Sequence, residues 1–157
     1  MTFQVSRDDG LFYRQTLFDQ AKTVVLKVGS AVLTAADGLN IDFIDTLCSQ
    51  IAFLRSSGRQ VILVSSGAVA AGRQRLRVPK QPGEELRVKQ ALAAAGQGLL
   101  MQAYEHRFAR RDNQHVAQIL LTHADLSQRD RYLNVRNTIL TLFEFGVVPI
   151  INENDTV

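Results

Sequence analysis

Four short segments of the chain are almost continuously apolar, and each of them ends in glycine or polar residues. A strand that is covered on both faces of a parallel sheet shows such a run, whereas a strand with one exposed face alternates apolar and polar residues. The sequence therefore predicts four strands of a largely parallel sheet. These strands are expected over residues 23–28, 60–64, 115–121 and 147–151.

Between the predicted strands, apolar residues recur with the spacing of helices. The first helix should follow an N-cap at Asn40 or Asp42 and end at Ser57-Gly58. The last should span 132–145 and end at Gly146. Because helices alternate with strands, the sequence predicts an α/β fold with right-handed crossovers.

A long helical region is expected over residues 84–110, although Gly96 and Gly98 could interrupt it. Residues 1–20 lack clean periodicity and predict a partly helical extension at 11–20. The apolar residues of the long helix are expected in the core; they are Leu86, Leu92, Leu99, Leu100, Tyr104 and Phe108.

Two of the predicted strands end in turns that suit an anion. The strand at 60–64 runs into Ser65-Ser66-Gly67, where glycine lets backbone N–H groups face outward at a helix start. In the strand at 23–28 only Lys27 is charged, and Gly29-Ser30 follows it. A snorkelling edge lysine explains this pattern, and so does an ammonium aimed at a phosphate. A βαβ unit places both turns on the same sheet edge, where α/β proteins bind ligands.

The fourth predicted strand delivers Asn152-Glu153-Asn154-Asp155 to that same edge. A simple turn needs one or two such polar residues, so four in a row favour a ligand site.

Composition restricts the classes of protein that the chain can represent. Its 157 residues fit one domain, 46% of them are hydrophobic, and no apolar run is long enough to span a bilayer. The one cysteine, Cys48, lies on an apolar helical face and is expected in the core, which favours a reducing, cytoplasmic location. The net charge of +3 is spread over the chain. The basic stretch at 73–80 is interpreted as a solvated surface.

Several motifs fail on inspection. Gly67 and Gly72 have the spacing of a phosphate-binding Walker A loop, but Arg73 and Gln74 stand where lysine and a hydroxyl residue are required. The three histidines lack the spacing of metal ligands or of a hydrolase triad, so no metal site is assigned.

Five segments together resemble the glutamate 5-kinases, a branch of the amino acid kinase family. The resemblance covers residues 23–157. The two glycine turns are widespread among amino acid kinases, whereas Asn-Glu-Asn-Asp and Tyr-Leu-Asn-x-Arg-Asn-Thr are typical of the glutamate-specific branch. The segments are 27–34, 64–72, 89–102, 131–138 and 148–155.

The resemblance implies a three-layer αβα sandwich with a mainly parallel sheet, the amino acid kinase fold. It implies ATP-dependent phosphorylation of the γ-carboxylate of L-glutamate to L-glutamyl 5-phosphate, the first step of proline biosynthesis. Mg²⁺ would come with ATP, without an assigned protein ligand. Proline feedback inhibition and a homo-oligomer of the intact enzyme are implied as well, and no membrane or nucleic-acid partner. Lys27 and Gly29 are assigned to the ATP phosphates and the transition state, and Ser66, Gly67, Asn152 and Asp155 to glutamate.

In this family the kinase domain continues beyond the Asn-Glu-Asn-Asp loop and supplies most of the nucleotide site, and many bacterial members add a PUA domain. We therefore expect residues 1–22 to be an extension and 23–157 the glutamate-binding part of a kinase domain. The chain is expected to be a fragment that is inactive alone, with an unfinished sheet whose last strand no helix covers.

Three alternatives stay open. The kinase part of a bifunctional pyrroline-5-carboxylate synthase performs the same reaction. A non-catalytic assembly partner could dock through its sheet edge. A nucleic-acid-binding module could use residues 73–89, although no recognised motif supports it.

Overall fold

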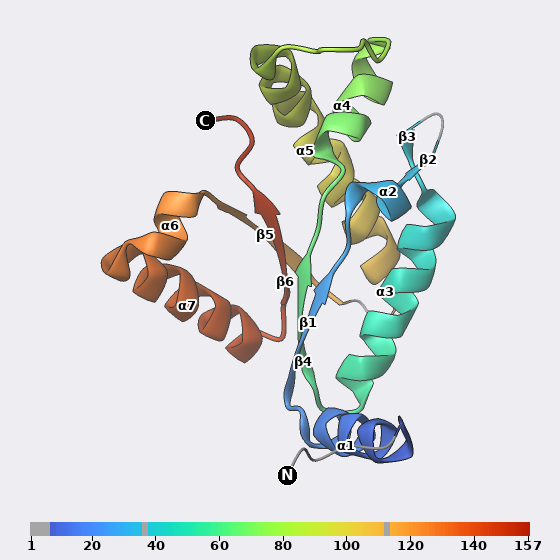
Figure 1. The fold of residues 1–157 in the computed structure, drawn as a ribbon, viewed down its shortest axis with the longest axis vertical. Coiled ribbons are helices and arrows are strands. Elements are labelled where there is room, and N and C mark those ends of the chain that lie inside the picture. Colours follow the sequence, from blue (N-terminus) through green and yellow to red (C-terminus); the bar gives the residue numbers. More distant parts are fainter. Residues whose placement is uncertain (1–6, 36–37, 112–113) are drawn as a thin grey trace.

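The computed structural model describes residues 7–35, 38–111 and 114–157, and a four-stranded parallel sheet runs through its centre (Figure 1). All pairings within this sheet are parallel. The strand order is β1-β4-β6-β5. The strands are β1 (Thr23–Lys27), β4 (Gln60–Val64), β5 (Val116–Leu121) and β6 (Val148–Glu153). The four predicted strands and their parallel arrangement are confirmed.

Helices lie on both faces of the sheet, which gives the three layers expected of an α/β sandwich (Figure 1). One face carries α3 (Ile41–Ser56) and α5 (Leu86–Phe108), with α4 (Ala68–Leu76) packed on α5. The other face carries α6 (His123–Ser127) and α7 (Arg129–Glu144).

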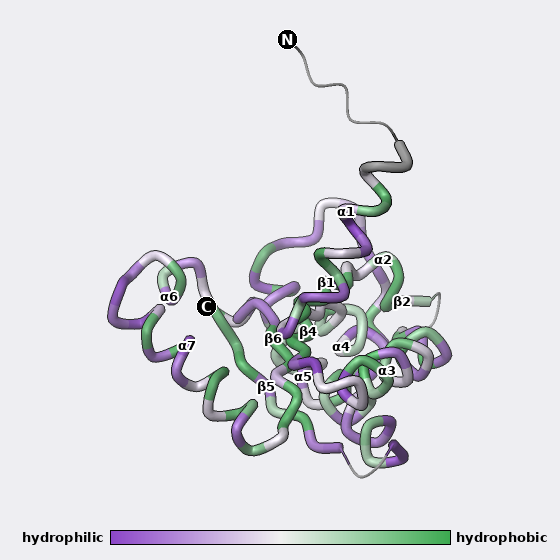
Figure 2. Tube along the Cα trace, turned by 90° about the horizontal axis from the view of Figure 1, so that it is seen from below, coloured by the Kyte–Doolittle hydropathy of each residue, from purple (hydrophilic) through white to green (hydrophobic). Residues whose placement is uncertain are grey.

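Three smaller elements complete the fold. Helix α2 (Ser30–Leu33) follows β1, and β2 (Thr34–Ala35) pairs with β3 (Gly38–Leu39) in a short antiparallel ladder. The helix α1 (Arg7–Gln20) lies at the amino ends of the strands and projects from the remaining structure in Figure 2. The extension is therefore helical over more residues than the predicted 11–20.

The hydrophobic core lies between the sheet and helices α3 and α5. Tyr104 and Phe108 of α5 are fully buried there, and so is Cys48 of α3, as expected. Burial raises the pKa of the Cys48 thiol to about 12. In contrast, Leu86 at the start of α5 is 71% exposed, so its predicted core position was wrong.

Helix α5 is continuous through Gly96 and Gly98, so the interruption considered there does not occur. Gly96 instead lets α4 and α5 approach closely. A Cβ on Gly96 would lie 2.9 Å from the Ala68 carbonyl carbon, and a Cβ on Gly72 would lie 2.7 Å from the Leu92 carbonyl carbon. The two glycines therefore form the contact between the helices, which explains Gly72 without a phosphate-binding loop.

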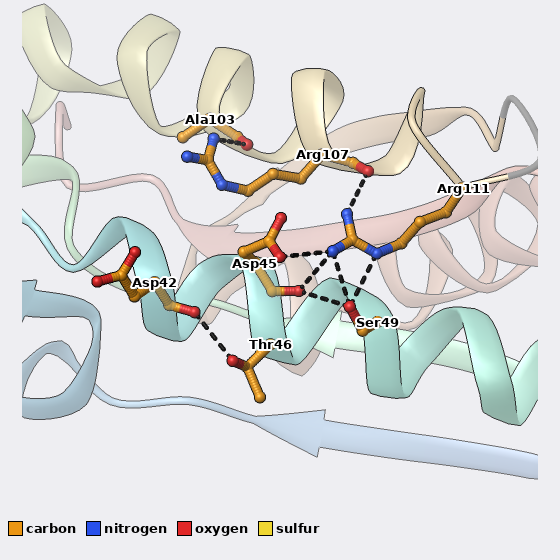
Figure 3. Close-up of polar contacts among 7 residues, drawn as sticks. All are labelled: Asp42, Asp45, Thr46, Ser49, Ala103, Arg107 and Arg111. Carbon is orange, nitrogen blue, oxygen red and sulfur yellow. Dashed lines mark hydrogen bonds and ion pairs between the residues drawn. The ribbon is translucent and has the colours of Figure 1, made fainter.

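The end of α5 is fastened to α3 by Arg111 (Figure 3). Its guanidinium pairs with the Asp45 carboxylate at 2.7 Å and donates to Ser49 Oγ and to the Asp45 carbonyl oxygen. The neighbouring guanidinium lowers the pKa of Asp45. This cluster sets the position of α5 relative to the α3 side of the sheet.

The last strand differs from the expectation in two ways. It continues through Asn152 and Glu153, because these residues pair with Leu120 and Leu121 of β5. It also lies in the middle of the sheet, between β4 and β5, and α7 packs on it. The prediction of an uncovered last strand was therefore wrong.

Helix α7 begins three residues earlier than predicted, and α6 was not predicted at all. Thr122 and Asp125 form a capping box at the start of α6, where the Asp125 carboxylate accepts hydrogen bonds from the amide and the hydroxyl of Thr122. Across residues 7–35, 38–111 and 114–157, none of the helices combines the length and apolar character that crossing a membrane requires.

Candidate functional site

A cavity of about 700 Å³ opens at the carboxyl ends of the strands, the upper end of the sheet in Figure 1. Three of its lining segments follow β1, β4 and β6, which the predicted βαβ arrangement brings to one edge. Ser30, Ser66, Gly67 and Asp155 come together in its lining. The sequence singled out these residues in three separate segments, because Ser66 and Gly67 belong to one turn.

The turn at Ser65-Ser66-Gly67 presents backbone donors to this cavity. Gly67 caps α4 in the left-handed conformation, with φ of 99°, which glycine adopts without strain. The residues that follow it, Ala68, Val69 and Ala70, line the cavity with the first turn of α4. The first N–H groups of a helix lack partners within the helix, so they can bind an anion.

Ser65 has a structural role beside this turn. Its amide donates to the Ile151 carbonyl oxygen at 2.8 Å, which ties the end of β4 to β6. Its hydroxyl shares a buried 2.8 Å hydrogen bond with the Tyr104 hydroxyl of α5. Burial raises the pKa of Tyr104 to about 12, so the phenol stays neutral. Hydrogen bonds to β6 and to α5 therefore hold this turn in place, while Ser66 lines the cavity.

Lys27 is the last residue of β1 and is exposed. In the register of the sheet it lies beside Val64, which lies beside Ile151. The alternation of β1 places its side chain on the same face as Val25, opposite Leu26, which packs on the core. Lys27 therefore stands at the correct edge, but it does not line the cavity.

Gly29 precedes α2 with φ of −79°, a conformation open to any residue. A Cβ built there would meet nothing within 4 Å, so neither the backbone conformation nor a close neighbour requires glycine at this position. Like Lys27, it is absent from the cavity lining. An ammonium, a backbone amide and a hydroxyl, the groups that Lys27, Gly29 and Ser30 carry, are donors of the kind that bind phosphate.

Asn152 and Asp155 differ in their surroundings. Asn152 is 5% exposed on the core face of β6, and its Nδ2 has no hydrogen-bond partner among the described residues. It does not line the cavity. Asp155 does, and its burial, followed by the charge of Glu153, raises the pKa of its carboxyl. An approaching ammonium would favour the ionised form of Asp155.

The sequence did not predict that residues 73–89 form one wall of the cavity. Arg73 of α4 pairs with Glu84 at 2.6 Å and donates to the carbonyl oxygens of Val78 and Pro79. Its side chain is 18% exposed, so the interpretation of this stretch as a solvated surface was wrong at Arg73. The clamp fixes the loop between α4 and α5 beside the cavity. Three further cations line the same wall: Arg77, Lys80 and Lys89.

A hint of this wall is present in the sequence. An arginine and a glutamate flank a segment with two prolines and a glycine, which cannot continue a helix. Among the described residues, no group of three or more histidine, cysteine or acidic side chains is arranged to hold a metal ion.

Comparison with known proteins assigns a family to this arrangement. The family model described as "Amino acid kinase family" matches residues 22–157. A curated relative named glutamate 5-kinase, from Desulfotalea psychrophila, is 59% identical over 144 residues. Proteins of the same name from Geobacter sulfurreducens and Cupriavidus pinatubonensis are 53% and 54% identical over 145 and 144 residues. These matches cover 92%, 92% and 91% of the chain, in that order.

The chain spans 38% of the length of each of these relatives. Among solved structures, a carbamate kinase from Giardia matches with a TM-score of 0.54 and 16% sequence identity, over 85% of this chain and 58% of that one. This likeness supports the fold.

Proposed function

The chain belongs to the amino acid kinase family, and from that premise we propose that it carries the glutamate-binding part of a glutamate 5-kinase. The reaction is phosphorylation of the γ-carboxylate of L-glutamate by ATP, which gives L-glutamyl 5-phosphate. Residues 23–157 form this part, and residues 1–22 are an extension before it. In this proposal ATP and Mg²⁺ are the cofactors, the intact enzyme is a homo-oligomer inhibited by proline, and its location is cytoplasmic.

The observation that carries the proposal is the convergence of Ser66, Gly67 and Asp155 in one cavity at the carboxyl edge. Glutamate has two carboxylates and one ammonium, so its site needs donors and one anion. The Gly67 turn and the first amides of α4 offer donors for a carboxylate. Asp155 offers the anion for the ammonium. The fourth predicted glutamate residue, Asn152, lies next to this edge, and its amide nitrogen has no hydrogen-bond partner among the described residues.

Lys27 and Gly29 are proposed to act on the phosphoryl group. When bound, ATP would supply the phosphoryl group that the glutamate oxygen attacks. Phosphoryl transfer depends on positioning and on stabilising charge at the transferred oxygens rather than on a covalent nucleophile. The exposed ammonium of Lys27 and the amide of Gly29 are suited to this role. Their place outside the cavity lining separates them from Ser66, Gly67 and Asp155.

The alternatives retain different support. The kinase part of a pyrroline-5-carboxylate synthase would use the same site for the same reaction. A nucleic-acid-binding module would find less free positive charge in the basic stretch than expected, because Arg73 pairs with Glu84 and donates to two carbonyl oxygens.

A chimera tests the proposal. It joins residues 1–157 to the C-terminal portion of the relative that is 59% identical. Hydroxylamine traps acyl phosphates, so the assay measures hydroxamate formed from ATP and L-glutamate. We expect hydroxamate from L-glutamate and none from L-glutamine, which lacks the γ-carboxylate. A folded chimera, verified by circular dichroism, that forms no hydroxamate would contradict the proposal.

A further inference from the structure

A second cavity, of about 450 Å³, lies at the amino ends of the strands, opposite the candidate site. Its lining comes from the end of α3, the start of β4 and the segments that enter β5 and β6. Two arginines and a histidine line it, and none of the described residues in its lining is acidic. These three residues are Arg55, Arg59 and His115.

Neither arginine pairs with a carboxylate in the described part of the chain, where four other ion pairs occur. Arg55 donates to Gln114 Oε1 at 2.9 Å and to the Gly146 carbonyl oxygen, so it links the segments that enter β5 and β6. Burial lowers the pKa of Arg55. A partly buried guanidinium that has only neutral acceptors lacks the anion that normally offsets its desolvation.

Arg59 is held in place but is not fully satisfied. Its guanidinium carbon lies 5.1 Å from the centre of the Phe18 ring, and its terminal nitrogens donate to Ser57 Oγ and the Phe18 carbonyl oxygen. Its Nε is buried without a hydrogen-bond partner among the described residues. Buried donors in folded proteins normally have partners, so this nitrogen indicates a missing acceptor.

We propose that this cavity binds a small oxyanion, a carboxylate or a phosphate, between Arg55 and Arg59. Guanidinium groups match the planar oxygens of carboxylates and the oxygens of phosphates, and the His115 imidazole can donate a third hydrogen bond. Phe18 belongs to α1, which precedes the residues matched by the family model. The extension thus positions one of the two cations. The site lies at the edge opposite the proposed glutamate cavity and does not depend on it.

Inorganic phosphate is the probe for this site. In the ¹⁵N-labelled chain, the Nε–Hε resonance of Arg59 is followed during a phosphate titration at constant ionic strength, with sodium chloride as the balancing salt. Arg59→Gln identifies the resonance by its loss. We expect a saturable shift of this resonance that persists when L-glutamate is present. A resonance that does not move, or that moves equally with chloride, would overturn the proposal.

Calorimetry with matched variants locates the bound phosphate. Arg59→Gln should weaken phosphate binding about tenfold, which corresponds to about 1.4 kcal/mol. Arg136→Gln removes an exposed charge on α7 and should leave binding unchanged. Because the candidate site is also cationic, Arg77→Gln is the decisive comparison. Loss of binding in Arg77→Gln but not in Arg59→Gln would place phosphate in the other cavity and overturn the inference.

Discussion

The close approach of α4 and α5 makes Gly96→Ala a sharp test of the fold around the site. The new Cβ would lie 2.9 Å from the Ala68 carbonyl carbon and would overlap its oxygen. Carbon atoms in contact are about 3.5–4.0 Å apart. The opposing atoms belong to the α4 backbone and cannot rotate away, so the helices must separate by roughly 1 Å.

The expected cost follows from two opposing effects. Overpacking of this kind costs about 1–3 kcal/mol or more, while alanine gains about 1 kcal/mol over glycine in a helix. We expect a net loss of about 1–2 kcal/mol in the free energy of unfolding, because backbone atoms cannot relax as side chains do. For a chain of this size the melting temperature should fall by roughly 2–8 °C. Since α4 begins at the Gly67 turn, glutamate affinity should fall as well.

Gly98→Ala is the matched control on the same helix. Gly98 is exposed, and a Cβ there meets nothing within 4 Å. This variant should therefore gain about 0.5–1 kcal/mol from helix propensity. Thermal unfolding followed by circular dichroism compares both variants with the parent chain. If Gly96→Ala is as stable as Gly98→Ala, the helices do not approach as described.

Four further predictions concern single side chains. Cys48, whose pKa is raised to about 12 by burial, should not react with a thiol reagent at neutral pH until the chain unfolds; rapid labelling of the native chain would contradict its burial. Arg73→Gln should loosen the loop between α4 and α5, and trypsin should then cleave faster after Lys80. In the control variant Arg87→Gln, which loses only an exposed pair with Glu85, cleavage after Lys80 should occur at the parent rate. Equal cleavage rates in the two variants would show that Arg73 does not hold this loop. Lys27→Ala in the chimera should lower turnover about a hundredfold with little change in the glutamate KM, and an unchanged turnover would refute the assignment. Asp155 has a raised pKa, so its ionised form is disfavoured in the free chain and stability should increase as pH falls through that pKa; Asp155→Asn should accordingly raise the melting temperature at neutral pH, and a lower one would refute this reading.

Local sequence signals predicted much of this fold because their causes are local. Asn40 caps α3, and its side chain accepts a hydrogen bond from the Phe43 amide, as a short polar residue before an apolar helix predicts. The four apolar runs gave the strands because a strand that is covered on both faces needs apolar residues throughout. The turn at Gly67 was also predictable, because the left-handed conformation that it requires is a local property of glycine.

Features that depend on distant partners could not be predicted in this way. Gly96 was considered as an interruption of α5, because neither segment alone predicts its contact with Ala68. Arg73 was interpreted as solvated, because Glu84 becomes its partner only when the loop folds back. The central place of β6 was missed, since strand order depends on how crossovers pass over the sheet. Lys27 was assigned correctly to the edge, but its separation from the cavity required the register.

A titration of the ¹⁵N-labelled chain with L-glutamate is the most direct test of the proposed site. We expect saturable shifts of the Gly67, Ala68 and Asp155 amides and none at Gly146, which lines the opposite cavity. In Asp155→Asn the same shifts should require a much higher concentration of L-glutamate. If L-glutamate leaves the Gly67 and Asp155 amides unmoved, or if Asp155→Asn titrates like the parent chain, the carboxyl edge is not the glutamate site.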